Sequence, residues 1–139
     1  MFENLPLNQN NDRILLPGSY KKIKLPDGRI ADSSIVFRES TKEVILSSKV
    51  EDRSDVMRTV STVSAILIPG SAVTRIESKG VKVSLFGGAI IYATFFFNNN
   101  YEAKRMTNSV EYLMTNQFSL YMKADELKTV VERFNTLKM

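Results

Sequence analysis

An uncharged run in the second half of the chain places the strongest constraint on the fold. Residues 83–97 read VSLFGGAIIYATFFF, and three asparagines follow directly. A transmembrane helix needs about 20 apolar residues, so this run is too short to be one. The Gly87–Gly88 pair, with the β-branched and aromatic residues that follow it, favours extended structure. The sequence therefore predicts a strand over residues 89–97.

Both faces of this predicted strand are apolar. Successive side chains of a strand point to opposite sides, so the residues divide into two sets. One set is Ala89, Ile91, Ala93, Phe95 and Phe97, and the other is Ile90, Tyr92, Thr94 and Phe96. A strand that is apolar on both faces is normally central and covered from both sides. Two interpretations remain open: both faces lie in the core of one chain, or the second face is covered by another copy.

Turn signals between alternating apolar residues predict further antiparallel strands. A hairpin is expected over residues 13–30, with a turn at 26–28 that reads Pro-Asp-Gly. A second hairpin is expected over residues 33–48. A three-stranded meander is expected over residues 72–97, with its first turn at 78–80.

Other segments have helical spacing. Apolar residues three and four apart predict a helix over 54–63, followed by a strand that ends at Ile68. A helix is also predicted over 101–115, because Asn99 and Glu102 stand at the spacing of a helix N-cap and its acidic partner. The clearest amphipathic pattern lies over 125–138.

These elements together define the expected fold class. We expect an α+β fold: a bent, mostly antiparallel and partly barrel-like sheet, packed by the two C-terminal amphipathic helices. A short strand over residues 118–123 connects those helices. Residues 1–12 show no periodic pattern and are expected to form an N-terminal arm. Residues 13–139 are expected to form a single domain, since that length suits one hydrophobic core.

The residue types that are missing argue against catalysis. The chain has no cysteine and no histidine, so thiolate chemistry, disulfides and every site built on imidazole are excluded. The acidic cluster at residues 51–55 lacks the glycine and the alternating oxygen ligands of a calcium loop. We therefore expect no enzymatic activity, no cofactor and no metal.

A basic hairpin is the candidate binding site for nucleic acid. The net charge of +4 and the pI near 9.4 permit an acidic partner without requiring one. Lysines next to a tyrosine suit single-stranded nucleic acid, because lysines contact phosphates and tyrosine stacks on a base. The same lysines also suit an edge strand that must avoid wrong pairing. The candidate residues are Tyr20, Lys21, Lys22, Lys24 and Arg29.

The expected function is a non-enzymatic assembly or interaction subunit that self-associates, as in a viral or other large complex. The alternative is a small nucleic-acid-binding protein that uses the hairpin at 20–29. The expected partner is a second copy or another protein subunit, and no small-molecule substrate is inferred. The chain start lacks the basic and apolar regions of a signal peptide, so a cytoplasmic location, in a host cell or with a virion, is expected. The expected interface residues are Phe2, Leu5, Ile90, Tyr92 and Phe96.

Overall fold

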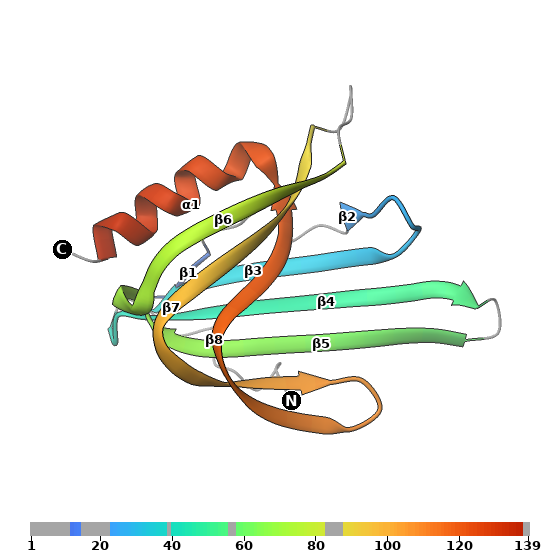
Figure 1. The fold of residues 1–139 in the computed structure, drawn as a ribbon, viewed down its shortest axis with the longest axis horizontal. Helices are drawn as coiled ribbons and strands as arrows, with labels where there is room; N and C mark the ends of the chain where they lie inside the picture. Colours follow the sequence, from blue (N-terminus) through green and yellow to red (C-terminus); the bar gives the residue numbers. More distant parts are fainter. Residues whose placement is uncertain (1–11, 15–22, 39, 56–57, 83–87, 138–139) are drawn as a thin grey trace.

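The described part of the chain forms one curved antiparallel sheet and one α-helix (Figure 1). The computed structural model describes residues 12–14, 23–38, 40–55, 58–82 and 88–137. The strands are β1 (Asp12–Ile14), β2 (Ile23–Lys24), β3 (Ile30–Arg38), β4 (Glu43–Asp55), β5 (Arg58–Pro69), β6 (Val73–Lys82), β7 (Ile90–Met106) and β8 (Val110–Lys123). A 3-10 turn at Gly70–Ala72 connects β5 to β6, and the helix α1 (Ala124–Leu137) follows β8 directly.

Strands β3, β4 and β5 form an antiparallel meander that builds one wall of a half-barrel. Ile35 pairs with Leu46, which in turn pairs with Ile66, so apolar side chains align across the three strands. The hairpin predicted over 33–48 is confirmed as β3–β4. The turn predicted at 26–28 is also confirmed, because it joins β2 to β3.

The helix predicted over residues 54–63 is wrong, because β5 occupies most of this segment. Val60, Thr62 and Val63 pair with residues of β4. These β-branched side chains restrict χ1 and fit an extended backbone better than a helix. Pairing with an adjacent long strand therefore outweighs the helical spacing of the valines.

The strand predicted over 89–97 is confirmed as the first half of β7. This half lies between β6 and β8, whereas the second half of β7 lies between β5 and β8. The register between β7 and β8 shifts between Phe96 and Tyr101, where the three exposed asparagines lie. β7 bends strongly there, which carries β6–β8 across the front of β3–β5 (Figure 1).

The prediction of three strands over residues 72–97 does not match the described residues, which form two. β6 continues through residues 78–80 without a turn, and Gly80 pairs with Ile91 of β7. A glycine in a strand lacks a side chain to pack but does not prevent pairing. The described part of this region therefore holds two strands, β6 and the start of β7.

The helix predicted over residues 101–115 is also wrong. This segment forms the end of β7, a turn at 107–109 and the start of β8. Ala103 pairs with Leu113 of β8 and with Ile66 of β5, so the segment extends the sheet. Glu102 pairs with Met114 and caps no helix. The expected α+β fold with two packing helices is thus corrected to an antiparallel half-barrel with one C-terminal helix.

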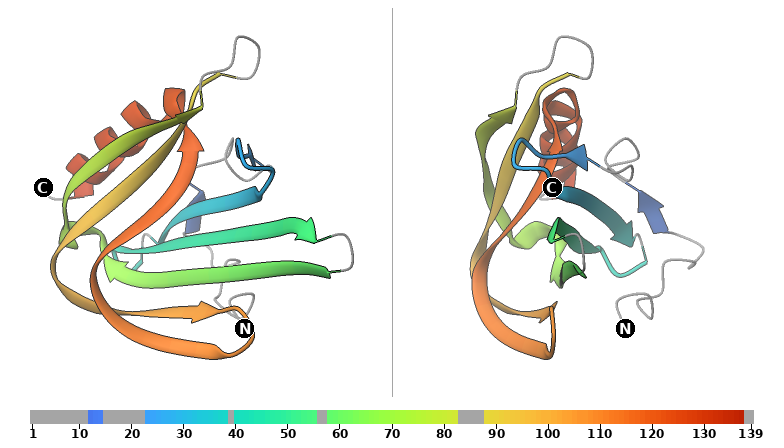
Figure 2. Two further views of the ribbon diagram at one scale, coloured as in Figure 1. Left: turned by 45° about the vertical axis from the view of Figure 1, so that its right-hand side comes forward. Right: turned by 90° about the vertical axis from the view of Figure 1, so that its right-hand side faces the viewer.

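The helix predicted over 125–138 is confirmed as α1. Its first turn carries Asp125 and Glu126, which complement the helix dipole. Val130 and Phe134 are buried, and the Phe134 ring lies 5.5 Å from that of Phe95 on β7. Figure 2 shows α1 packed on the concave side of the sheet, where it covers the core. The largest fully buried core side chains are Phe95, Phe134, Ile35, Ile45, Leu46, Ile68, Leu120, Met122, Val36, Val44 and Val73.

The helices of the described ranges are too short or too polar to cross a membrane.

Candidate functional site

The β7–β8 hairpin exposes an apolar face to solvent. Val110, Tyr112 and Met114 alternate along β8, and their exposed fractions are 41%, 58% and 62%. Among the described strands, β8 pairs with β7 alone, so its other side is an edge of the sheet. The Lys104 amine lies 5.6 Å from the centre of the Tyr112 ring, on the same outer face. We call Val110, Tyr112 and Met114 the β8 patch.

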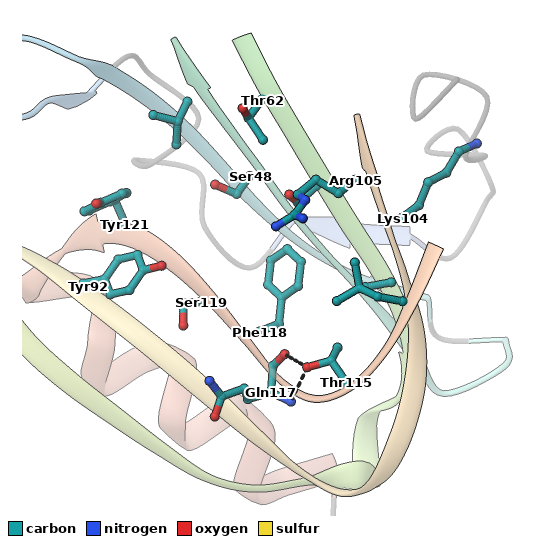
Figure 3. Close-up of a pocket in the computed structure, with 14 residues that line it drawn as sticks. Ser48, Thr62, Tyr92, Lys104, Arg105, Thr115, Gln117, Phe118, Ser119 and Tyr121 are labelled. Carbon is teal, nitrogen blue, oxygen red and sulfur yellow. Dashed lines mark hydrogen bonds between the residues drawn. The ribbon is translucent and has the colours of Figure 1, made fainter. Parts of the chain in front are cut away.

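A second feature is an open cavity of about 340 Å³ between β8 and the wall formed by β4 and β5 (Figure 3). β8 divides the concave side in two. Leu120 and Met122 face the core below α1, whereas Gln117, Ser119 and Tyr121 line the cavity. The remaining lining residues are Ser48, Val50, Thr62, Ser64, Tyr92, Ala103, Lys104, Arg105, Leu113, Thr115 and Phe118.

Aromatic rings form one wall of the cavity. Tyr92 and Tyr121 are opposite each other on β7 and β8, and their ring centres are 4.6 Å apart. Figure 3 shows the Tyr92 hydroxyl directed into the cavity and the Phe118 ring standing inside it. Such a wall offers flat apolar surface with polar groups at its rim.

Two arginines adjoin the cavity, and both are paired with acids. The Arg105 guanidinium lies 2.8 Å from the Glu111 carboxylate and reaches over the cavity, whereas Lys104 points away from it (Figure 3). The Arg29 Nε donates to Asp27 at 2.7 Å. Each charge at the rim is therefore compensated by a neighbour of opposite sign.

The Asp27–Arg29 pair links the β2–β3 turn to the cavity wall. Burial of the Arg29 guanidinium lowers its pKa, but hydrogen bonds and charge interactions with Asp27 and Tyr121 outweigh burial and leave the pKa raised. The backbone N–H of Arg29, together with its side chain, holds the pKa of Asp27 below the ordinary value of 3.8. Arg29 thus stays charged, and it interacts electrostatically with Tyr121, a residue that lines the cavity.

No family model, curated protein or solved structure matches this chain.

The residues of the basic hairpin are only partly described. Tyr20, Lys21 and Lys22 lie outside the described residues. Lys24 is exposed on β2, and Arg29 is half-buried against Asp27 and Tyr121. The structure therefore places Arg29 next to the cavity, and Lys24 on the surface of a short edge strand.

The expected interface residues occupy three different environments. Ile90 is buried within the chain, in a small cluster with Ile23, Leu25 and Ala31. Tyr92 lines the cavity. Phe96 is half-buried beneath Arg75, whose guanidinium lies 3.9 Å from the ring centre. Phe2 and Leu5 lie outside the described residues.

The sequence-based prediction missed the β8 patch because it assigned residues 101–115 to a helix. Val110, Tyr112 and Met114 are spaced two apart, which is the period of one strand face. That signal was present, but it competed with apolar residues at helical spacing in the same segment. The cavity left no comparable signal, because its lining comes from four strands.

No cluster of three or more acidic side chains suited to a metal ion occurs in the part of the chain that the structure describes.

Proposed function

We propose that this protein is a non-enzymatic interaction subunit that self-associates by pairing the β8 edge of one copy with that of a second. The observation that carries the proposal is the β8 patch, three exposed apolar side chains on one face of an edge strand. An exposed apolar edge is a template for pairing with another chain. Through this pairing the chain would join a larger assembly, viral or other.

The other long edge of the sheet differs in a way that supports the choice of β8. β6 pairs with β7 alone among the described strands and carries Arg75, Glu77 and Lys79, all exposed. Charged residues on an edge strand discourage pairing with other chains. Residues 110–115 of β8 carry a single charge, Glu111, and it is paired with Arg105. Of the two long edge strands in the described residues, β8 therefore combines an open edge with an apolar face and β6 does not.

A two-fold arrangement suits the residues of β8. In an antiparallel pair centred on Tyr112, Val110 of one copy lies opposite Met114 of the other. Glu111 lies opposite Leu113, so no like charges face each other across the strands. Such a contact uses the same surface on both copies and closes on itself, which gives a dimer and not a filament.

The test is the mass of the protein in solution, measured by sedimentation or by light scattering after gel filtration. We expect a dimer for the wild-type chain and a folded monomer for the double variant Tyr112→Lys/Met114→Lys. Both side chains are exposed, so the substitutions should leave unfolding unchanged within about 0.5 kcal/mol. Leu67→Lys is the matched control, because Leu67 is also an exposed apolar strand residue, but it lies on β5.

A monomeric wild-type protein would contradict the proposal, as would a double variant that still dimerises. Loss of the dimer in Leu67→Lys as well would show that the association does not depend on β8 in particular.

The same measurement separates this proposal from nucleic-acid binding. Lys24 is exposed, so the basic hairpin remains the alternative site. Single-stranded oligonucleotide added at low salt should not change the mass under the leading proposal. Under the alternative, it should bind with a log K against log salt slope of about −0.7 for each phosphate neutralised. In that case Lys24→Ala should make the slope shallower.

A further inference from the structure

A row of polar residues crosses the concave face beside the apolar core. Ser33, Ser48, Ser64, Arg105 and Glu111 pair in register across five adjacent strands, from β3 to β8. An apolar row lies on the same face, two residues further along each strand. It consists of Ile35, Leu46, Ile66, Ala103 and Leu113. The concave face thus changes from apolar to hydroxyl-rich within one repeat of the strand.

This polar row is more than the exposed end of the sheet. Ser33 is only 2% exposed, and its hydroxyl has no hydrogen-bond partner among the described residues. A buried hydroxyl without a partner costs stability, whereas an apolar side chain of similar size does not. Its neighbours in the row, Ser48 and Ser64, line the cavity floor. The Ser33 hydroxyl is therefore placed where folding alone favours an apolar residue, and the half-buried Ser48 and Ser64 continue the row into the cavity.

The polar groups around the cavity fall into two sets. Thr62 bonds to Thr107, Ser119 bonds to Thr94, and Thr115 bonds to the backbone of Gln117. The side chains of the second set make no hydrogen bond within the described part of the chain. This set consists of Ser48 on β4, Ser64 on β5, Tyr92 on β7 and Gln117 on β8. Four strands thus present unused donors and acceptors to one cavity.

The charge of the cavity restricts the chemistry of a ligand. The described residues of its lining include no carboxylate, Arg105 is compensated by Glu111, and Lys104 points away (Figure 3). An anionic ligand would have to compete with Glu111 for Arg105, and a cationic ligand would find no partner. A neutral ligand with several hydroxyl groups meets neither obstacle.

We propose that the cavity binds a neutral pyranose ring, such as one hexose unit of a glycan. The apolar face of the ring would rest on Tyr92 and Phe118, and its hydroxyls would bond to Ser48, Ser64 and Gln117. The volume of about 340 Å³ lies at the small end of ligand pockets, which suits one ring more than an extended chain. This site is separate from the β8 patch and does not depend on self-association.

The test is a titration of the full chain with methyl α-glucoside, methyl α-galactoside and methyl α-mannoside, followed by amide NMR shifts. We expect at least one glycoside to shift cavity amides with a Kd on the order of 1 to 10 mM. The affinity should be the same at about 0.05 M and about 0.5 M salt, because a neutral ligand is not screened. Glucuronate, which adds a carboxylate to the same ring, should bind no better than methyl α-glucoside.

Variants connect the binding to the cavity. Ser48→Ala and Ser64→Ala should each weaken binding about 3- to 10-fold, the effect of losing one neutral hydrogen bond. Tyr92→Ala should weaken it about 10-fold or more through lost ring contact. Ser47→Ala is the matched control, because Ser47 adjoins Ser48 on β4 but points to the opposite face; it should bind as the wild type does.

Three results would overturn the proposal. The first is the absence of cavity shifts with all three glycosides at about 50 mM, well above the expected Kd. The second is binding of glucuronate alone that disappears at high salt, which would define an anion site. The third is binding that Ser48→Ala, Ser64→Ala and Ser47→Ala leave equally unchanged in folded protein.

Discussion

Phe95 and Phe96 are adjacent in β7, yet the sheet gives them different roles. Phe95 is fully buried and its ring contacts that of Phe134 on α1. Phe96 lies on the opposite face, half-buried beneath the guanidinium of Arg75. A cation over an aromatic ring at a partly exposed site contributes about 0.5 to 1 kcal/mol. The burial of one residue of the pair therefore dominates the stability of this strand.

At this scale we predict that Phe95→Ala lowers the free energy of unfolding by about 3 to 5 kcal/mol, the usual cost of truncating a buried aromatic. Phe96→Ala should lower it by less than about 1.5 kcal/mol. Denaturant unfolding of both variants, monitored by circular dichroism, checks the difference. Equal losses in the two variants would show that the outer face of β7 is as buried as the inner face.

Among the elements, the β2–β3 turn and the edge strand β6 each contain a glycine, and the two glycines differ in backbone conformation. Gly28 has a φ of 90°, and Gly80 lies in the extended strand. A Cβ atom added at either position would meet no heavy atom within 4 Å. Alanine substitutions at these two positions therefore test the effect of backbone conformation on stability without side-chain clashes.

We predict that Gly28→Ala lowers the free energy of unfolding by about 1 to 2 kcal/mol, because an L-residue resists positive φ. Gly80→Ala should be neutral or should stabilise the protein by up to about 1 kcal/mol, since it reduces the freedom of the unfolded chain. Thermal unfolding of the two variants side by side measures the contrast. A stabilised Gly28→Ala variant would be incompatible with a positive φ at residue 28.

For the whole molecule, α1 is the element that closes the core. The sheet is a half-barrel, so its concave side stays open where no further strand covers it. Val130 and Phe134 fill that side against residues from both walls of the sheet. Without the helix, Phe95 and Leu120 would lose their cover.

We predict that a chain ending at Lys123 loses cooperative unfolding and binds a hydrophobic dye, as a partly folded state does. Thr129→Ala provides a control, because Thr129 is exposed on α1 and the change should shift unfolding by no more than about 0.5 kcal/mol. Cooperative unfolding of the truncated chain at wild-type stability would show that the sheet needs no helix.

Patterns within short segments determined the elements that the sequence predicted correctly. The turn at 26–28, the hairpin over 33–48 and the helix at 125–138 each have one dominant period or turn signal. The strand at 89–97 is indicated by the β-branched and aromatic residues that follow Gly87–Gly88. These signals lie within each segment, so the sequence alone was sufficient to predict the elements.

Tertiary structure decided the segments where two periods compete. Residues 54–63 and 101–115 contain apolar side chains at helical spacing. The described part of the first segment nevertheless lies in β4 and β5, and the second forms the end of β7, a turn and the start of β8. β5 and the second half of β7 also pair with each other, as in Val63 with Met106, and these strands are far apart in the sequence. The cavity is a stronger case: Ser48, Ser64, Tyr92 and Gln117 come from four strands and meet only because the sheet curves. No local pattern records that curvature, since it arises from the bend of β7 and from closure by α1.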